Sequence, residues 1–206
     1  GGETLVNTGS TAGTQETTPS GGGNVAMDAN GNYVVVFSDK NVNSGDVYAQ
    51  RYNAAGTAQG AAILVNTAVT TDIQDWPVVA MDPSGNFVVA WNSNAQDGGG
   101  WGIYAQRFNA AGTAQGSAFR VNTSTAGNQE GASIGMADDG SFVVTFTDFN
   151  ATSGDVYIQR YDASGSAQGG NVRVNTTTAN PQQFCEIAVS GSGDFVVVWE
   201  SQNQDT

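Results

Sequence analysis

The chain has 206 residues, of which only 12% are charged, and its formal net charge is −13 with six basic residues in all. This balance argues against a nucleic-acid partner and against an anionic membrane surface, since both are bound through clustered Lys and Arg. No apolar run approaches the roughly 20 residues of a transmembrane helix. The single cysteine, Cys185, excludes an internal disulfide.

A turn followed by a short apolar strand recurs four times and organises the chain. The copies are Met27–Phe37, Met81–Trp91, Met136–Phe146 and Val189–Trp199. The aromatic residues that end successive copies are 54, 55 and 53 positions apart. A fixed period of this length is the signature of a repeat architecture.

Each repeat predicts four short strands, because apolar and aromatic runs alternate with turns rich in Gly, Asn and Asp. The first strands are 24–27, 78–81, 133–136 and 186–189, and the second strands are the apolar runs that end at Phe37, Trp91, Phe146 and Trp199. The third strands are 47–52, 103–108 and 156–161, and the chain begins with a strand of the fourth kind, 3–8. The third strand of each repeat carries Gln and Arg, and the fourth ends in Val-Asn-Thr. The fourth repeat lacks a match to the third strand.

Four strands per repeat predict an all-β fold, a β-propeller-like array of four-stranded blades, close to the kelch period of about 50 residues. A β-solenoid is the alternative, although its coils are usually shorter. The chain is then a single repeat array, 1–206, of about 3.7 blades. Its repeat units are approximately 3–52, 61–108, 117–161 and 170–206.

Three segments resemble a family of tandem repeats in very long exported bacterial proteins, often associated with RTX-type calcium-binding repeats. They are Gly102–Gly112, Val121–Gln129 and Gly140–Phe146. The resemblance covers nearly the whole chain and implies a propeller-like scaffold in an extracellular or cell-surface setting. It implies no known reaction, and the nonapeptide calcium repeat itself is not in this sequence.

Two loops between the second and third strands suggest a metal site. Oxygen-bearing side chains at alternating positions, followed by Gly and a second carboxylate, suit Ca²⁺, which takes six to eight oxygen ligands. The candidate ligands are Asp39, Asn41, Asn43, Asp46, Asp148, Asn150 and Asp155. The other interpretation is structural, because Asn, Ser, Gly and Asp dominate loops for conformational reasons.

No catalytic constellation is evident from the sequence. The chain has no histidine, and paired carboxylates for glycoside hydrolysis do not separate from the Asp residues of turns. Trp101 lies in a Gly-rich loop, where it could stack on a sugar ring as a ligand-binding residue or pack over a blade edge.

These observations predict a non-enzymatic structural or adhesive module outside a bacterial cell, with Ca²⁺ as the candidate stabilising ion. Because the last repeat lacks its third strand and open sheet edges pair readily, we expect self-association or continuation in a longer chain. A glycan-binding propeller lectin is the alternative function, and a glycosidase is the weaker alternative.

Overall fold

The computed structural model describes residues 3, 5–6, 14–17, 23–41, 45–149 and 154–203. It contains strands and no helix in this part of the chain. The strands are β1 (Gln15–Glu16), β2 (Val25–Met27), β3 (Tyr33–Asp39), β4 (Asp46–Tyr52), β5 (Ile63–Leu64), β6 (Gln74–Met81), β7 (Phe87–Asn94), β8 (Trp101–Phe108), β9 (Phe119–Arg120), β10 (Gln129–Met136), β11 (Phe142–Asp148), β12 (Asp155–Tyr161), β13 (Val172–Arg173), β14 (Gln182–Val189) and β15 (Phe195–Ser201).

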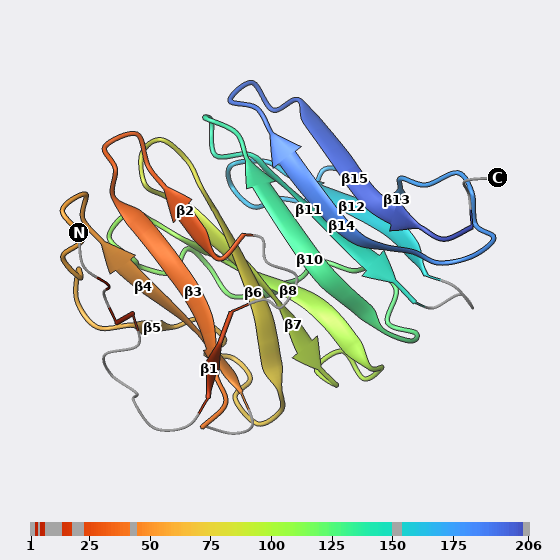
Figure 1. The fold of residues 1–206 in the computed structure, drawn as a ribbon, viewed down its shortest axis with the longest axis horizontal. Coiled ribbons are helices and arrows are strands. Elements are labelled where there is room, and N and C mark those ends of the chain that lie inside the picture. Colours follow the sequence, from red (N-terminus) through yellow and green to blue (C-terminus); the bar gives the residue numbers. More distant parts are fainter. Residues whose placement is uncertain are drawn as a thin grey trace.

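The strands form four antiparallel sheets, which we call blades 1 to 4. Blade 1 contains β1–β5, blade 2 β6–β9, blade 3 β10–β13, and blade 4 contains β14 and β15. In blades 2 and 3 the strands pair in sequence order. The blades follow one another along the molecule, and β2, β6, β10 and β14 lie side by side as the inner strands (Figure 1). The predicted all-β, propeller-like array of four-stranded blades is therefore confirmed.

Aromatic pairs hold the second and third strand of each blade in register. Phe87 stacks on Phe108 with ring centroids 4.9 Å apart, and Phe142 stacks on Tyr161 at 4.7 Å. Both pairs are direct neighbours across their strands. Because aromatic cross-strand pairs stabilise one register, this recurrent pair explains why the aromatic spacing is constant in the sequence.

The core lies between successive blades, where the two faces of β7 contribute to different clusters. Val89 and Trp91 pack with blade 1 residues, whereas Val88 and Ala90 pack with residues of blade 3. Alternate residues of a strand point to opposite faces, so the second strand of a blade is buried on both sides. This burial explains the continuous apolar run that marks each repeat.

Arginine side chains connect blade 1 to a turn of blade 2 and blade 2 to a turn of blade 3. Arg51 donates from Nη1 to the carbonyl of Ala110 at 2.8 Å, and Arg107 donates from Nη2 to the carbonyl of Ala163 at 2.6 Å. Arg107 also donates to the carbonyl of Ser164. Arg160 holds the same position in blade 3, is exposed, and donates to none of the described residues.

This difference gives a matched pair of variants. We expect Arg107→Ala to lower the free energy of unfolding by about 1–2 kcal/mol, because it removes charge-assisted bonds between blades. Arg160→Ala should change it by less than about 0.5 kcal/mol, as is usual at an exposed position without such a feature. Urea unfolding of both variants measures the difference, and equal losses would show that the contact between blades contributes nothing.

Candidate functional site

The inner strands begin with an irregularity that the sequence pattern did not predict. The strands β6, β10 and β14 each start four residues before the predicted ones, and each has a register shift after its second residue. The residue that follows has a positive φ: 50° at Trp76, 67° at Gly131 and 53° at Phe184. Bulky side chains rarely adopt this conformation, and such strain collects at functional sites.

The residue before each irregularity is acidic in two of these blades, and blade 1 provides a third acid. Strand pairing places Glu16 opposite Ser38, Asp75 opposite Asn92, Glu130 opposite Thr147, and Gln183 opposite Glu200. These four pairs are equivalent positions in blades 1 to 4. Three carboxylates and one amide therefore occupy the same end of neighbouring inner strands.

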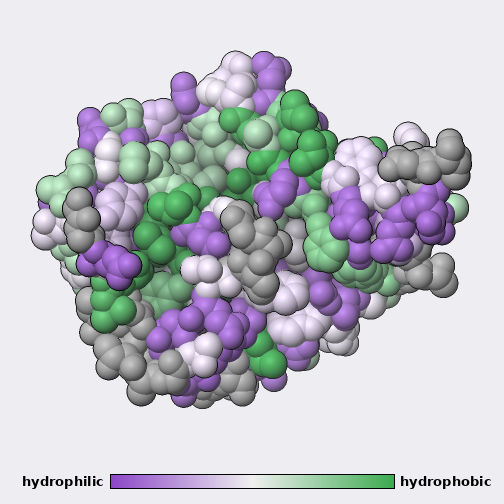
Figure 2. Space-filling view, viewed as in Figure 1, coloured by the Kyte–Doolittle hydropathy of each residue, from purple (hydrophilic) through white to green (hydrophobic). Residues whose placement is uncertain are grey.

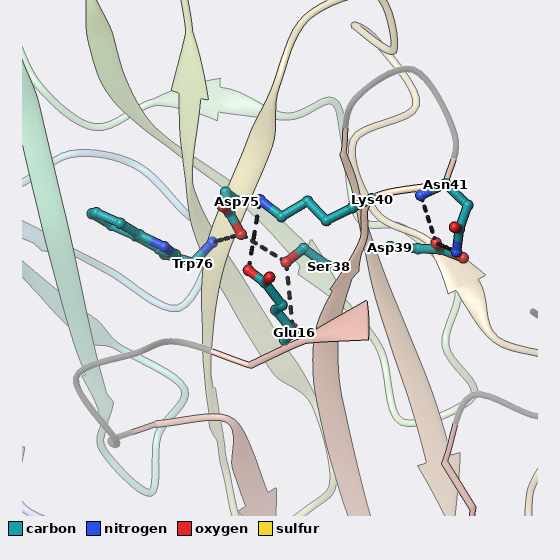
Figure 3. Close-up of polar contacts among 7 residues, drawn as sticks. All are labelled: Glu16, Ser38, Asp39, Lys40, Asn41, Asp75 and Trp76. Carbon is teal, nitrogen blue, oxygen red and sulfur yellow. Dashed lines mark hydrogen bonds and ion pairs between the residues drawn. The ribbon is translucent and has the colours of Figure 1, made fainter. Parts of the chain in front are cut away.

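The carboxylate of Asp75 is buried and surrounded by donors. Its Oδ1 accepts hydrogen bonds from Ser38 Oγ at 2.7 Å and from the Trp76 backbone N at 2.8 Å. Lys40 Nζ contacts Oδ2 and lies 3.9 Å from Oε2 of Glu16, as the close-up shows (Figure 3). A lysine thus joins the two carboxylates of adjacent blades and balances part of their charge.

Glu130 has a different environment from Asp75. It is half-buried, and burial raises the pKa of its carboxyl above the ordinary value, while a hydrogen bond with the Asn128 side chain opposes this shift. Desolvation favours the neutral form of a carboxyl group. The two acids therefore differ in their surroundings: Asp75 lies beside the ammonium group of Lys40, whereas burial raises the pKa of Glu130.

Glu130 lines a cleft of about 400 Å³ at this end of the inner strands. We call it the inner-strand cleft; its lining residues are Trp76, Glu130, Gly131, Thr147, Phe149, Gln183 and Phe184. Phe184 is 62% exposed although its side chain is large and apolar. The space-filling view shows hydrophobic patches bordered by hydrophilic side chains over the inner strands (Figure 2). An aromatic cleft with an acid in its wall is the usual character of a ligand site.

The predicted metal ligands form two pairs that face each other across hairpins. Asp39 lies opposite Asp46 in blade 1, and Asp148 lies opposite Asp155 in blade 3. Asn41 bonds to Asp39 through its backbone N at 3.0 Å and its Nδ2 at 2.6 Å. The remaining candidates, Asn43 and Asn150, lie outside the described residues.

These four carboxylates have structural partners. Asp46 Oδ1 accepts from Asn66 Nδ2 at 2.7 Å, and Asp155 Oδ1 accepts from Asn175 Nδ2 at 2.6 Å. Burial raises the pKa of Asp46, and the charge of Asp39 adds to the effect. The described residues contain no cluster of three or more acidic, His or Cys ligands. Calcium binding therefore stays a prediction.

Trp101 is the first residue of β8, and its backbone N donates to Asn128 Oδ1 at 3.3 Å. It is not among the lining residues of the inner-strand cleft. The aromatic residues at the cleft are instead Trp76, Phe149 and Phe184. The sequence contains a signal for Trp76 and Phe184, because a Gln lies two positions before the equivalent residue in every repeat. These residues are Gln15, Gln74, Gln129 and Gln182.

The sequence matches no protein-family model and no curated protein. Three solved structures share the fold at low identity. An endo-arabinase from Bacteroides thetaiotaomicron aligns at a TM-score of 0.50 and 16% identity, over 85% of this chain and 68% of that one. An α-L-arabinanase from Penicillium chrysogenum, complexed with arabinobiose, aligns at 0.53 and 14%, over 84% and 54%. A protein of unknown function from Dyadobacter fermentans aligns at 0.59 and 11%, over 87% and 61%.

These likenesses correct two predictions. The predicted non-enzymatic adhesive module is wrong, because structures with this fold include enzymes that act on glycans. The prediction that the chain is not an enzyme is wrong for the same reason. That prediction relied on the lack of carboxylates distinct from those of turns, whereas the structure places several carboxylates at the inner strands. The chain spans between 54% and 68% of the length of these three proteins. Among the described residues no helix is long and apolar enough to cross a membrane.

Proposed function

We propose that the protein binds a neutral glycan in the inner-strand cleft and hydrolyses its glycosidic bonds, with Glu130 as the general acid. The observation that carries this proposal is the contrast between Glu130 and the other carboxylates at equivalent positions. Glycoside hydrolysis uses one carboxyl group that holds a proton and a second that is ionised. The likeness to arabinanases agrees with this chemistry but supplies only the fold.

In the proposed reaction, the Glu130 carboxyl donates its proton to the glycosidic oxygen as the bond from this oxygen to the anomeric carbon breaks. Water attacks that carbon from the other face and gives its proton to a carboxylate base. Glu16 is the more exposed of the two carboxylates at equivalent positions of blades 1 and 2, with a side chain that is 43% exposed, and neither of the two lines the inner-strand cleft. Asp75 is buried among its donors and instead holds Lys40 and the backbone of Trp76 in place.

The cleft favours a neutral glycan over an acidic one. Glu16 and Asp75 share a single lysine, Lys40, Glu130 adds a further carboxyl group, and the chain as a whole carries a net charge of −13. A polymer rich in uronate or sulfate would be repelled. Trp76 and Phe184 offer apolar faces on which a sugar ring can stack. A neutral glycan of this kind as the ligand agrees with the proposed extracellular location.

A panel of polysaccharides tests the proposal. We expect release of reducing ends from at least one of linear arabinan, xylan, galactan and mannan, and none from polygalacturonate. Affinity electrophoresis on the same polymers measures binding separately. Binding without hydrolysis would leave a lectin, and neither binding nor hydrolysis across the panel would overturn the proposal.

Trp76→Ala tests the stacking surface. We expect the dissociation constant for the glycan that the protein binds to rise by roughly 2- to 10-fold, because an aromatic contact contributes about 0.5–1.5 kcal/mol beyond its buried area. Trp101→Ala is the matched control, since Trp101 does not line the inner-strand cleft. Isothermal titration of both variants measures the effect. A larger loss from Trp101→Ala would place the glycan at the β7–β8 hairpin instead.

A further inference from the structure

The inner-strand cleft has a gap in its row of large side chains. The residues with a positive φ at the three irregularities are Trp76, Gly131 and Phe184, and all three line the cleft. They belong to β6, β10 and β14, of which β10 lies between the other two (Figure 1). Cys185, which follows Phe184, donates from Sγ to the carbonyl of Gly131 at 3.6 Å, so β14 contacts β10 at this point. A glycine therefore stands between two large aromatic residues.

The space at Gly131 is open. A methyl group added at this residue would meet no atom of the described residues within 4 Å. The same addition at Gly135, further along the strand, would overlap the side chain of Val189. Trp76 and Phe184 adopt a similar positive φ at the equivalent positions, so the backbone conformation does not by itself require glycine. Gly131 thus leaves room that a large side chain takes in blades 2 and 4.

The groups around this gap suit a sugar ring, which has two apolar faces and a polar edge. Trp76 and Phe184 provide apolar surface, and Phe184 is 62% exposed. Glu130 directly precedes Gly131, and Gln183 adds an amide to the wall of the cleft. A mostly apolar cleft with a few polar groups is typical of a site that binds and orients a small ligand.

We propose that the gap at Gly131 is the subsite for one sugar ring of the glycan, held beside Glu130. This inference rests on the proposed function and gives the position of the ring within the inner-strand cleft. The ring contacts Trp76 and Phe184 through its apolar faces. Its hydroxyl groups bind Gln183, because an amide both donates and accepts hydrogen bonds. An aromatic residue in blade 3, like those of blades 2 and 4, would fill the subsite.

Gly131→Phe tests the subsite, with Gly131→Ala as its matched control. Both should lower the midpoint of thermal unfolding by roughly 2–8 °C, because a residue other than glycine is strained at a positive φ. Only phenylalanine fills the gap, so Gly131→Phe should lose measurable glycan binding, whereas Gly131→Ala should bind nearly as tightly as the wild-type protein. The measurements are thermal unfolding, and affinity electrophoresis on the polysaccharide that the wild-type protein binds best.

A cysteine variant tests the subsite in protein that has already folded. Folded Gly131→Cys is treated with benzyl methanethiosulfonate, which attaches a benzylthio group to an accessible thiol. The natural cysteine, Cys185, is 3% exposed and burial raises the pKa of its thiol, so it should not react under the same conditions. We expect bound glycan to slow the labelling of Gly131→Cys, and the labelled protein to bind no glycan.

Two outcomes overturn the inference alone. One is glycan binding by Gly131→Phe equal to that of Gly131→Ala, and the other is labelling of Gly131→Cys that glycan does not slow. If Trp76→Ala still weakens binding in either case, the cleft remains the site and only the position of the ring is wrong. Failure of the proposed function is recognised separately: if the wild-type protein binds none of the four polysaccharides, the function and the subsite are both wrong.

Discussion

Replacing Glu130 by Gln is expected to lower glycan hydrolysis by about 10²- to 10⁴-fold, the usual contribution of a positioned general acid. The amide has the shape of the carboxyl group but cannot donate the required proton. Glycan binding should persist, because Trp76 and Phe184 are unchanged. Initial rates of reducing-end release, with binding measured alongside, separate the two effects.

The pH dependence of hydrolysis gives a second measure of the same group. Burial raises the pKa of Glu130, so its protonated form persists to a higher pH than that of an exposed glutamate. We expect kcat/KM to fall as the pH rises through this raised pKa. The residual rate of the Glu130→Gln variant should not fall with rising pH in this way.

Glu186→Gln is the matched control for this substitution. Glu186 also lies in an inner strand, β14, and its Oε2 accepts from Ser133 Oγ at 2.8 Å. It is not among the lining residues of the inner-strand cleft. A fall in activity as large in Glu186→Gln as in Glu130→Gln, or a Glu130→Gln variant with more than a tenth of the wild-type rate, would contradict the assignment.

The regular part of the fold was predictable because each repeat applies the same physical constraints. Strands such as Phe87–Asn94 are buried on both faces, so their apolar residues form continuous runs. The stacked pair Phe87 and Phe108 fixes one register, and its aromatic spacing recurs through the chain. The repeat period and the pattern of apolar and aromatic residues therefore predict the same architecture.

The candidate site was not predictable in the same way, because it lies where the regular pattern is broken. A positive φ at Trp76 and Phe184 interrupts the alternation of the inner strands, so the sequence pattern predicts a later start for β6 and β14. On that pattern, Asp75 and Glu130 fall in the connections between repeats. The pairing of Asp75 with Asn92 and of Glu130 with Thr147 shows that the two acids are equivalent.

The loop carboxylates illustrate the opposite error. Asp46 and Asp155 stand out in the sequence because they follow Gly in polar loops, as metal ligands do. In the structure each accepts a hydrogen bond from the Asn of a Val-Asn-Thr motif, Asn66 or Asn175. The same two asparagines accept from the backbone N of Val47 and Val156, both at 2.8 Å. This repeated network ties the fourth strand to the third, so these acids have a structural role whether or not calcium binds.

Trp91→Ala is expected to lower the free energy of unfolding by about 3–5 kcal/mol, the usual cost of removing a large aromatic side chain from a core. Trp91 is 1% exposed and belongs to the cluster between blades 1 and 2. Its Nε1 also donates to Oε1 of the fully buried Gln74 at 3.1 Å. The substitution therefore leaves both a cavity and a buried acceptor without its partner. Because domains are stable by only about 5–15 kcal/mol, chemical denaturation should show a large shift in midpoint.

The equivalent residue of blade 4, Trp199, allows the contribution of burial to stability to be separated from that of the hydrogen bond. Trp199 makes the same bond, from its Nε1 to Gln182 Oε1 at 2.9 Å, but it is only half-buried. Trp199→Ala should therefore cost less than half as much as Trp91→Ala, because less apolar surface returns to water and little cavity remains. Trp91→Phe keeps most of the buried ring and loses the bond, with an expected cost of about 1–3 kcal/mol. If Trp199→Ala proved as costly as Trp91→Ala, the hydrogen bond to Gln, rather than packing between the blades, would be the main contribution of these tryptophans.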